Sequence, residues 1–211
     1  MKVTHRVVDD KERGRMDWLR GYFSGATVYV VGSGPSLKGF DFSLLYGKRT
    51  IGVNHCYMDF KPEILVALDE IFFRQVFQRG HNVFDLAGKI LAGPASAQIP
   101  EKNLYRFWTN SNKVTLETWR FYSPALSGLC AINAALSGGA AKVILLGFDC
   151  TEGHYYTERW RHPEDGKKDK YLSLRRKFAA FEGWQHMIFN ACPQSTITVF
   201  PKITTKEAFN G

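Results

Sequence analysis

Short runs of apolar residues recur along the chain, separated by polar segments of varied length. Most runs span four or five residues and are rich in β-branched side chains, which is typical of buried strands. We expect strands over residues 27–31, 50–53, 64–68, 89–92, 104–108, 142–146 and 196–200. These runs predict a β-sheet that forms the centre of the molecule.

Helical segments lie between the predicted strands. Apolar residues spaced for one buried face predict a long helix over 171–190, and small residues predict a buried helix over 127–137 that ends at Gly138-Gly139. Residues 71–78 also have helical character, and 41–46 predict one helical turn. The alternation indicates an α/β fold: a Rossmann-like, mostly parallel sheet with helices on both faces.

Length and composition favour a single domain. The chain has 211 residues, of which 45% are hydrophobic, so it can bury one good core. Residues 1–25 predict a peripheral lead-in, in which the apolar side chains between Met16 and Phe23 form a short amphipathic helix. Residues 26–211 predict the main Rossmann-like domain.

Targeting and zinc-binding signals are absent from the sequence. No run of eighteen apolar residues is present, so no transmembrane helix is expected, and the charged N-terminus lacks the apolar centre of a signal peptide. The four cysteines form no CxxC pair, which argues against a zinc site and for reduced thiols. We therefore expect a cytoplasmic protein.

The chain is basic, with a formal net charge of +8 and a pI near 9.3. This balance suits an anionic substrate, a nucleic acid or a membrane surface, and equally a basic protein without such a partner. The densest cluster of lysine and arginine lies between Arg159 and Lys177. Such a cluster is also typical of a solvated helix face, so charge alone does not select a partner.

The predicted strand over 27–31 leads directly into a glycine-rich turn, Gly32 to Ser36. Such a turn brings backbone N–H groups close to a phosphate, because glycine has no Cβ and tolerates positive φ. We therefore expect Gly34→Val to abolish nucleotide binding in a protein that still folds. In parallel sheets, ligands bind beyond the carboxyl ends of the strands, where the strand order reverses. Other strand ends carry Asn54-His55, Asp69-Glu70 and Gly147-Phe148-Asp149, so these residues predict one shared site.

Further candidate residues bear on that site. Ser127 and Gly128 begin the small-residue helix; the serine is a good N-cap, and a helix N-terminus can hold an anion. Asp69 can ligate Mg²⁺, bind a ribose hydroxyl or cap the following helix. His154 lies in the loop after the strand over 142–146, with His162 further along, and a histidine can act as a general base near neutral pH.

Three segments resemble the bacterial CMP-sialic-acid sialyltransferases of glycosyltransferase family 42: VYVVGSGPSLKGFDFSLL, GVNHCY and SGLCAINAALSGGAAKVILLGFDC. The shared features are a glycine-Pro-Ser-Leu turn, an Asn at the end of the second strand, a Ser-Gly helix start and a Gly-hydrophobic-Asp strand end. The same segments resemble the DUF115 group, which includes the archaeal 6-hydroxymethylpterin diphosphokinase. The resemblance covers about two thirds of the chain, between Val28 and Pro201.

The resemblance implies a nucleotide site. The residues implied to hold the nucleotide and its phosphates are Gly32, Ser33, Gly34, Pro35, Ser36, Asn54, Asp69, Ser127, Gly128, Gly147 and Asp149. Tyr155 and Tyr156 resemble the paired tyrosines that steady the leaving phosphate in the sialyltransferases. Residues 26–211 would then form a nucleotide-binding transferase domain.

Three departures from the sialyltransferase pattern matter. Ser33 stands where those enzymes have Asn, and Asp69 also replaces an Asn, which points toward a metal and the diphosphokinase-like branch. The sialyltransferase catalytic histidine lies just before the last long helix. His162 is nearest to that place but several residues early, and His154 competes with it. We expect His154 to be the base and His162 to support the acceptor side.

The sequence therefore predicts a transferase with a nucleotide-activated donor: a glycosyltransferase that moves a sugar from a CMP- or UDP-type donor to an acceptor hydroxyl, with no cofactor required. The positive charge leaves open an anionic acceptor, including nucleic acid such as modified DNA. A first alternative is Mg²⁺-dependent diphosphoryl transfer from ATP to a small hydroxymethyl compound, with Asp69 and Asp149 as metal ligands. A second is a nucleotide- or nucleic-acid-binding module without catalysis.

Overall fold

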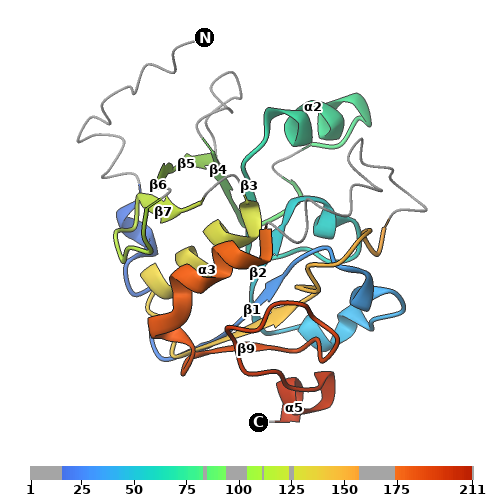
Figure 1. Ribbon diagram of the computed structural model, residues 1–211. Coiled ribbons are helices and arrows are strands. Elements are labelled where there is room, and N and C mark those ends of the chain that lie inside the picture. Colours follow the sequence, from blue (N-terminus) through green and yellow to red (C-terminus); the bar gives the residue numbers. More distant parts are fainter. Residues whose placement is uncertain are drawn as a thin grey trace.

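A computed structural model of the chain describes residues 16–82, 85–93, 104–110, 112–123, 126–156 and 174–210. Seven parallel strands form one sheet in the order β5-β4-β3-β2-β1-β8-β9 (Figure 1). The strands are β1 (Thr27–Val31), β2 (Arg49–Val53), β3 (Ile64–Ala67), β4 (Lys89–Ala92), β5 (Leu104–Arg106), β8 (Lys142–Leu146) and β9 (Ile188–Asn190). The predicted α/β class with a parallel sheet is confirmed.

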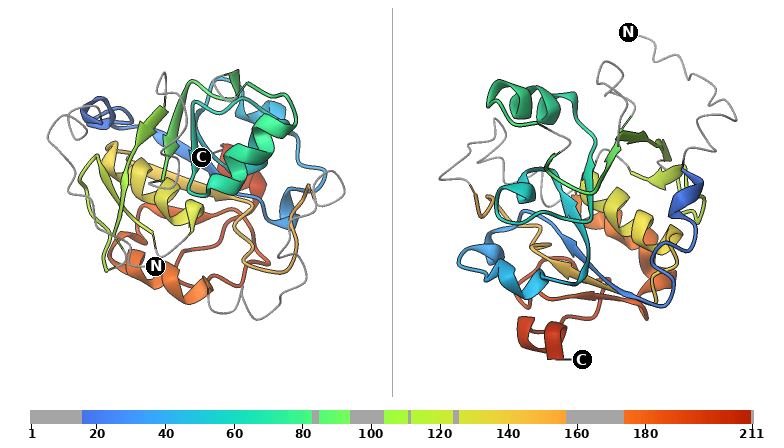
Figure 2. Two further views of the ribbon diagram at one scale, coloured as in Figure 1. Left: turned by 90° about the horizontal axis from the view of Figure 1, so that it is seen from above. Right: turned by 180° about the vertical axis from the view of Figure 1, so that it is seen from behind.

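Helices cover both faces of the sheet (Figure 2). On one face lie α3 (Ser127–Ser137) and the 3₁₀ helix η7 (Arg176–Trp184); on the other lie α2 (Glu70–Gln78) and α5 (Thr205–Asn210). Shorter 3₁₀ helices are η1 (Asp17–Leu19), η2 (Pro35–Leu37), η3 (Phe42–Leu45) and η4 (Asn54–Met58). Alternate residues of β1 supply the two cores, Val30 on the α3 side and Val31 on the α2 side, so one central strand serves both layers.

The strand order reverses beside β1. The chain runs from β1 through β2, β3 and β4 to β5 at one edge, and then returns to place β8 on the other side of β1. Thr27 to Val31 pair with Lys142 to Leu146 in register, so β1 and β8 end at the same level. The loops that leave these two strands therefore diverge at the reversal, where α/β proteins bind ligands.

The elements predicted after residue 170 are wrong in two respects. The expected helix over 171–190 is replaced by η7 and then by the edge strand β9, which pairs with β8; residues 171–173 lie outside the described residues. Gly183 weakens the helix, and Ile188 and Asn190 are buried on alternate positions, a strand period that pairing with β8 stabilises. Residues 196–200 form no strand, and only an isolated bridge joins Asn190 to Lys202.

Two other predictions need smaller corrections. The expected strand over 104–108 is divided into β5 and β6 (Trp108–Asn110), and β6 pairs with β7 (Arg120–Tyr122) in a separate two-stranded parallel sheet. Residues 1–15 of the lead-in lie outside the described residues; within 16–25 the helix comprises only η1, although Leu19 and Phe23 are fully buried in the core on the α3 side. None of the helices in the described ranges has the length and hydropathy needed to cross a bilayer.

Candidate functional site

A cavity of about 470 Å³ opens at the carboxyl ends of the central strands. Its walls come from the loops after β1, β2, β3 and β8, from the first turns of α2 and α3, and from the start of η7. The predicted site residues that line it are Gly32, Ser33, Gly34, Asn54, Asp69, Ser127, Gly128, Gly147, His154 and Tyr156. Residues predicted from four separate strand ends and one helix start therefore share one cavity.

The remaining predicted residues lie elsewhere. Pro35, Ser36, Asp149 and Tyr155 are not among the residues that line the cavity. The Tyr155 hydroxyl donates to Asp59 Oδ2 at 2.7 Å, and its ring packs against Phe42 on the α2 side of the sheet. The rings of Tyr155 and Tyr156 meet edge to face with 5.1 Å between centroids, but of the two, Tyr156 alone lines the cavity. His162 lies outside the described residues.

Most N–H groups of the glycine turn are used inside the protein. Gly32 N–H donates to the Leu146 carbonyl and Gly34 N–H to the Gly147 carbonyl, each at 2.8 Å. Among the described residues, only the N–H of Ser33 in the Gly32 to Gly34 segment has no hydrogen-bond partner. The turn thus offers the cavity one backbone donor and the Ser33 hydroxyl, where several donors had been expected.

The two glycines allow the turn to pack directly on the loop after β8. A Cβ at Gly34 would collide with the Asp149 carboxylate and lie 2.7 Å from the Gly147 carbonyl oxygen. A Cβ at Gly32 would lie 2.7 Å from the same oxygen and 3.1 Å from the Phe148 ring. Gly34→Val would therefore disturb internal packing, which argues against the expectation of a folded variant that has lost only phosphate space.

The Asp149 carboxylate accepts two hydrogen bonds from the glycine-rich turn. Its Oδ1 accepts from Ser36 N–H at 3.0 Å, its Oδ2 accepts from Ser36 Oγ at 2.7 Å, and the Cys192 thiol donates to Oδ1 at 3.3 Å. The residue is buried, with 5% exposure. Its carboxylate thus holds the glycine turn against the loop after β8, a role that differs from the predicted contact with nucleotide or metal.

Side chains from the segment after β9 donate hydrogen bonds to backbone carbonyl groups of the loop after β8. Ser195 Oγ donates to the Phe148 carbonyl at 2.6 Å, and Thr196 Oγ1 donates to the Cys150 carbonyl at 2.8 Å. Asn190 Nδ2 also donates to the Phe148 carbonyl, at 3.2 Å. Cys150, which lines the cavity, has an uncommon backbone conformation: its φ of 54° lies in the left-handed region. The Thr196 bond is made to the carbonyl of this residue.

Asn54 is the second non-glycine residue with positive φ, at 50°, and it too lines the cavity. Asparagine tolerates this conformation better than most residues. Its side-chain Oδ1 is buried and has no hydrogen-bond partner among the described residues. A buried acceptor left unpaired costs about 1–3 kcal/mol, so a ligand that donates to Oδ1 would recover that energy.

His154 is held at the cavity by the glycine turn. Its Nδ1 lies 2.9 Å from Ser33 Oγ, and the next residue, Tyr155, donates its N–H to the Ser33 carbonyl at 3.0 Å. The His154 ring stacks on Tyr156 with 5.2 Å between ring centroids and 10° between planes. Tyr156 is buried and meets His55 edge-on at 5.6 Å. These contacts place one histidine on each side of a buried tyrosine.

The start of α3 presents free backbone donors to the cavity. The helix N-cap is Leu126 and makes no side-chain cap bond, so the prediction of Ser127 as N-cap is wrong. Ser127 Oγ instead accepts from Leu68 N–H at 3.2 Å and ties α3 to the end of β3. The N–H groups of Ser127 and Gly128 have no partner among the described residues. With the helix dipole, these two donors form a site suited to an anion.

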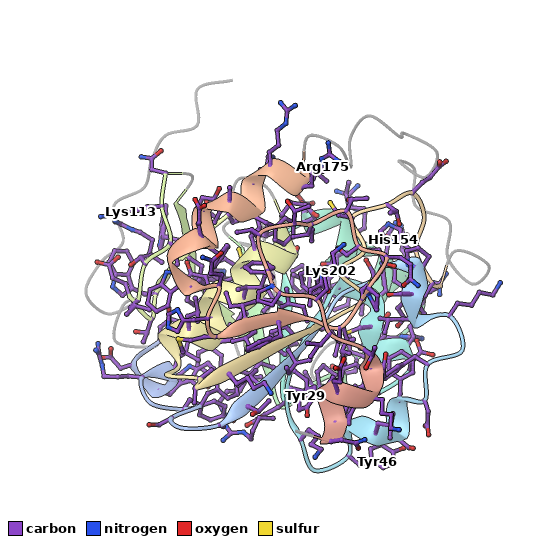
Figure 3. All side chains as sticks on the ribbon, turned by 60° about the horizontal axis from the view of Figure 1, so that its bottom comes forward. Tyr29, Tyr46, Lys113, His154, Arg175 and Lys202 are labelled. Carbon is purple, nitrogen blue, oxygen red and sulfur yellow. The ribbon has the colours of Figure 1, made fainter. Side chains whose placement is uncertain are left out.

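The cavity wall carries little charge in the part of the chain that the structure describes. Of the described residues that line it, none is a lysine or an arginine, and Asp69 is the one carboxylate. Arg175 projects outward from the start of η7, and Lys113 lies on the opposite side of the molecule from His154 (Figure 3). Burial raises the pKa of the Cys150 thiol to about 11, so it is neutral at physiological pH. The described part of the chain also contains no group of three His, Cys, Asp or Glu side chains arranged to hold a metal.

Several cavity residues were not among the predicted site residues. His55 was noted only as the neighbour of Asn54, yet it lines the cavity and is 3% exposed. Ile71 and Gln75 face the cavity from α2, and Phe178 does so from η7. The spacing of four residues between Ile71 and Gln75 places them on one helix face and was readable from the sequence. The position of Phe178 depended on η7, whose end was predicted wrongly.

Comparison with known proteins supports the fold. No protein-family model matches the sequence, and no curated protein matches it. Among solved structures, the chain is similar to the MAf glycosyltransferase from Magnetospirillum magneticum AMB-1, with a TM-score of 0.61 and 12% sequence identity. The match covers 97% of this chain and 39% of that protein, so this chain spans well under half of its length. At such low identity the likeness concerns the fold alone, which this chain shares with part of that protein.

Proposed function

We propose that this chain is a glycosyltransferase that binds a nucleotide-activated sugar in the cavity at the strand-order reversal. The observation that carries the proposal is the convergence on that cavity of N–H groups that have no partner among the described residues: Ser33 after β1, and Ser127 and Gly128 at the start of α3. The fold likeness to a glycosyltransferase supports the same reaction class.

The proposed role of these donors is to stabilise the leaving phosphate. When the sugar departs, the bond between its anomeric carbon and a phosphate oxygen breaks, and negative charge develops on that oxygen. Fixed N–H donors and a helix N-terminus lower the energy of that charge in a partly enclosed site. No lysine or arginine is found among the described lining residues. The N–H groups alone are therefore better suited to the charge of one phosphate than to that of two. We therefore favour a CMP-type over a UDP-type donor.

His154 is the proposed general base. When its Nδ1–H donates to the Ser33 hydroxyl, Nε2 carries the lone pair that can take a proton. The acceptor oxygen would form the new bond to the anomeric carbon as its proton passes to His154. Tyr156 would fix the ring plane by stacking, and the Asn54 Oδ1 would accept a hydrogen bond from the donor. His162 keeps its proposed role on the acceptor side.

The magnesium-dependent alternative finds less support in the described residues. In its predicted form, Asp69 and Asp149 hold the metal beside the transferring phosphates. Asp69 lies at the cavity, but the carboxylate of Asp149 is bonded to Ser36 and Cys192 beneath the glycine turn. Diphosphoryl transfer would therefore need a ligand set other than the predicted pair.

A thermal-shift screen tests the proposed donor. CMP, UDP, GDP and ATP are each added with Mg²⁺ and with EDTA. We expect CMP to stabilise the protein equally in both, by about 2.7 kcal/mol at a hundredfold excess over Kd, which is a rise in Tm of roughly 5–10 °C. Stabilisation by ATP only with Mg²⁺ would favour diphosphoryl transfer instead. CMP binding without transfer to any acceptor, in wild-type protein, would favour a non-catalytic nucleotide-binding module.

A further inference from the structure

The cavity has two walls that belong to opposite faces of the sheet. One wall is the start of η7, on the α3 side, where Leu174 and Phe178 are buried together with Ile197. The other is the first two turns of α2, on the opposite side. Figure 2 shows α2 standing clear of α3 and η7 at the end of the sheet. A ligand in this cavity therefore meets buried apolar side chains on one side and the exposed Ile71 of α2 on the other.

The α2 wall combines apolar surface with hydrogen-bonding groups. Ile71 lines the cavity although 54% of it is exposed, and Gln75 lies one turn later on the same helix face. Phe77, on the same helix, is also 46% exposed but does not line the cavity. Exposure of an isoleucine at the entrance of a cavity costs hydrophobic free energy, which a bound group covering Ile71 would return.

Asp69 gives this wall a negative charge. It is exposed, lies at the N-cap position of α2, and its side chain makes no cap hydrogen bond. The nearest cation on the helix, Arg74, is paired with Glu70 at 2.8 Å and does not line the cavity. None of the described residues that line the cavity is a lysine or an arginine, so within the described structure an anionic group at the α2 wall would face the Asp69 carboxylate without a neutralising cation.

We propose that the α2 wall receives the acceptor, and that Asp69 selects an uncharged, hydroxyl-bearing group with an apolar face over an anionic one. This inference rests on the proposed function, which assigns the donor to Ser33 and the start of α3. A ring with axial hydrogens and several hydroxyls fits the wall: its apolar face would cover Ile71, and its hydroxyls would bond to Gln75 and Asp69. Such an assignment excludes a polyanion from this wall.

A pair of matched glycosides tests the proposal: p-nitrophenyl β-D-glucopyranoside, which is neutral, and p-nitrophenyl β-D-glucuronide, which differs by a carboxylate at C6. Their Kd values are measured by ligand-observed NMR with the full chain, with and without CMP. We expect wild-type protein to bind the neutral glycoside about fivefold more tightly, and Asp69→Asn to remove most of that difference. Ile71→Ala should weaken both glycosides by about three- to tenfold. Phe77→Ala, the matched control, should change neither.

CMP affinity, measured on the same variants, separates this proposal from the proposed donor. We expect it to stay within about twofold of wild type in Ile71→Ala, which changes no charge and no hydrogen-bond donor of the proposed phosphate site. Asp69→Asn removes a negative charge from the cavity and should tighten CMP binding rather than weaken it. If CMP fails to bind while the glycosides bind as expected, the proposed nucleotide donor is wrong, but the assignment of the acceptor to the α2 wall is supported. The inference is overturned if neither glycoside binds, if the glucuronide binds as tightly as the glucoside, or if Ile71→Ala has no more effect than Phe77→Ala.

Discussion

The turn after β1 and the start of α3 border the same cavity, yet they use their backbone donors differently. In the turn, the N–H groups of Gly32 and Gly34 bond to the loop after β8, and only that of Ser33 is open. At α3, Ser127 and Gly128 both keep their N–H groups unpartnered within the described structure. A glycine-rich turn is therefore not by itself a phosphate cradle; here its glycines serve close packing, and the helix start supplies most of the free donors.

The largest expected effect comes from breaking the packed turn. Gly34→Val places a branched side chain against the Asp149 carboxylate and the Gly147 carbonyl, neither of which can move freely. We expect the free energy of unfolding to fall by about 3 kcal/mol or more, because overpacking at backbone contacts relaxes poorly. Urea unfolding followed by circular dichroism measures the loss. A variant with wild-type stability and no nucleotide affinity would restore the phosphate interpretation of this glycine.

A smaller loss should follow from removing the group that fastens the turn. Asp149→Ala leaves Ser36 N–H and the Ser36 hydroxyl without their acceptor, and we expect a loss of about 2 kcal/mol in stability. Ser36→Ala is the graded control: it removes only the hydroxyl bond and should cost about 1 kcal/mol. Both are measured by the midpoint of urea unfolding. Equal stability of Asp149→Ala and wild type would show that the carboxylate does not hold the turn.

The glycine turn also shows what the sequence could and could not predict. The apolar runs located β1, β2, β3 and β8, and the rule for parallel sheets then brought their ends together, where the structure has a cavity. The sequence could not show that the glycines also serve close packing, because what an added Cβ would meet depends on which loop packs against the turn. That loop, 147–150, was known from the sequence only as the end of another strand.

Other parts of the site depended on contacts between distant segments. Ser195 and Thr196 bond to the loop after β8 from far along the sequence: the bonds to Phe148 and Cys150 span 47 and 46 residues. Their pattern resembled a strand, since the apolar residues that follow alternate with polar ones. The boundary between η7 and β9 was missed for a similar reason: pairing with β8, rather than local propensity, decides it.

A negative charge introduced at the start of α3 tests whether its N–H groups, as well as that of Ser33, contact the phosphate. Leu126→Asp would provide the missing cap to α3 but place a negative charge beside the proposed phosphate. Leu126→Asn, with nearly the same shape and no charge, is the matched control. We expect the Kd for CMP to be about tenfold higher for Asp than for Asn at low ionic strength, with little difference in stability. Equal CMP affinities of the two variants, by calorimetry, would place the phosphate away from α3.

The central claim, that free N–H groups at Ser33 and the start of α3 hold the donor phosphate, is tested most directly by an NMR titration of the ¹⁵N-labelled protein with CMP. Amide protons that gain a hydrogen bond to phosphate shift downfield. We predict the largest shifts at Ser33, Ser127 and Gly128, and smaller ones at Gly32 and Gly34, whose N–H groups are already bonded to Leu146 and Gly147. Large shifts at Gly32 and Gly34 with none at Ser127 and Gly128 would contradict the account.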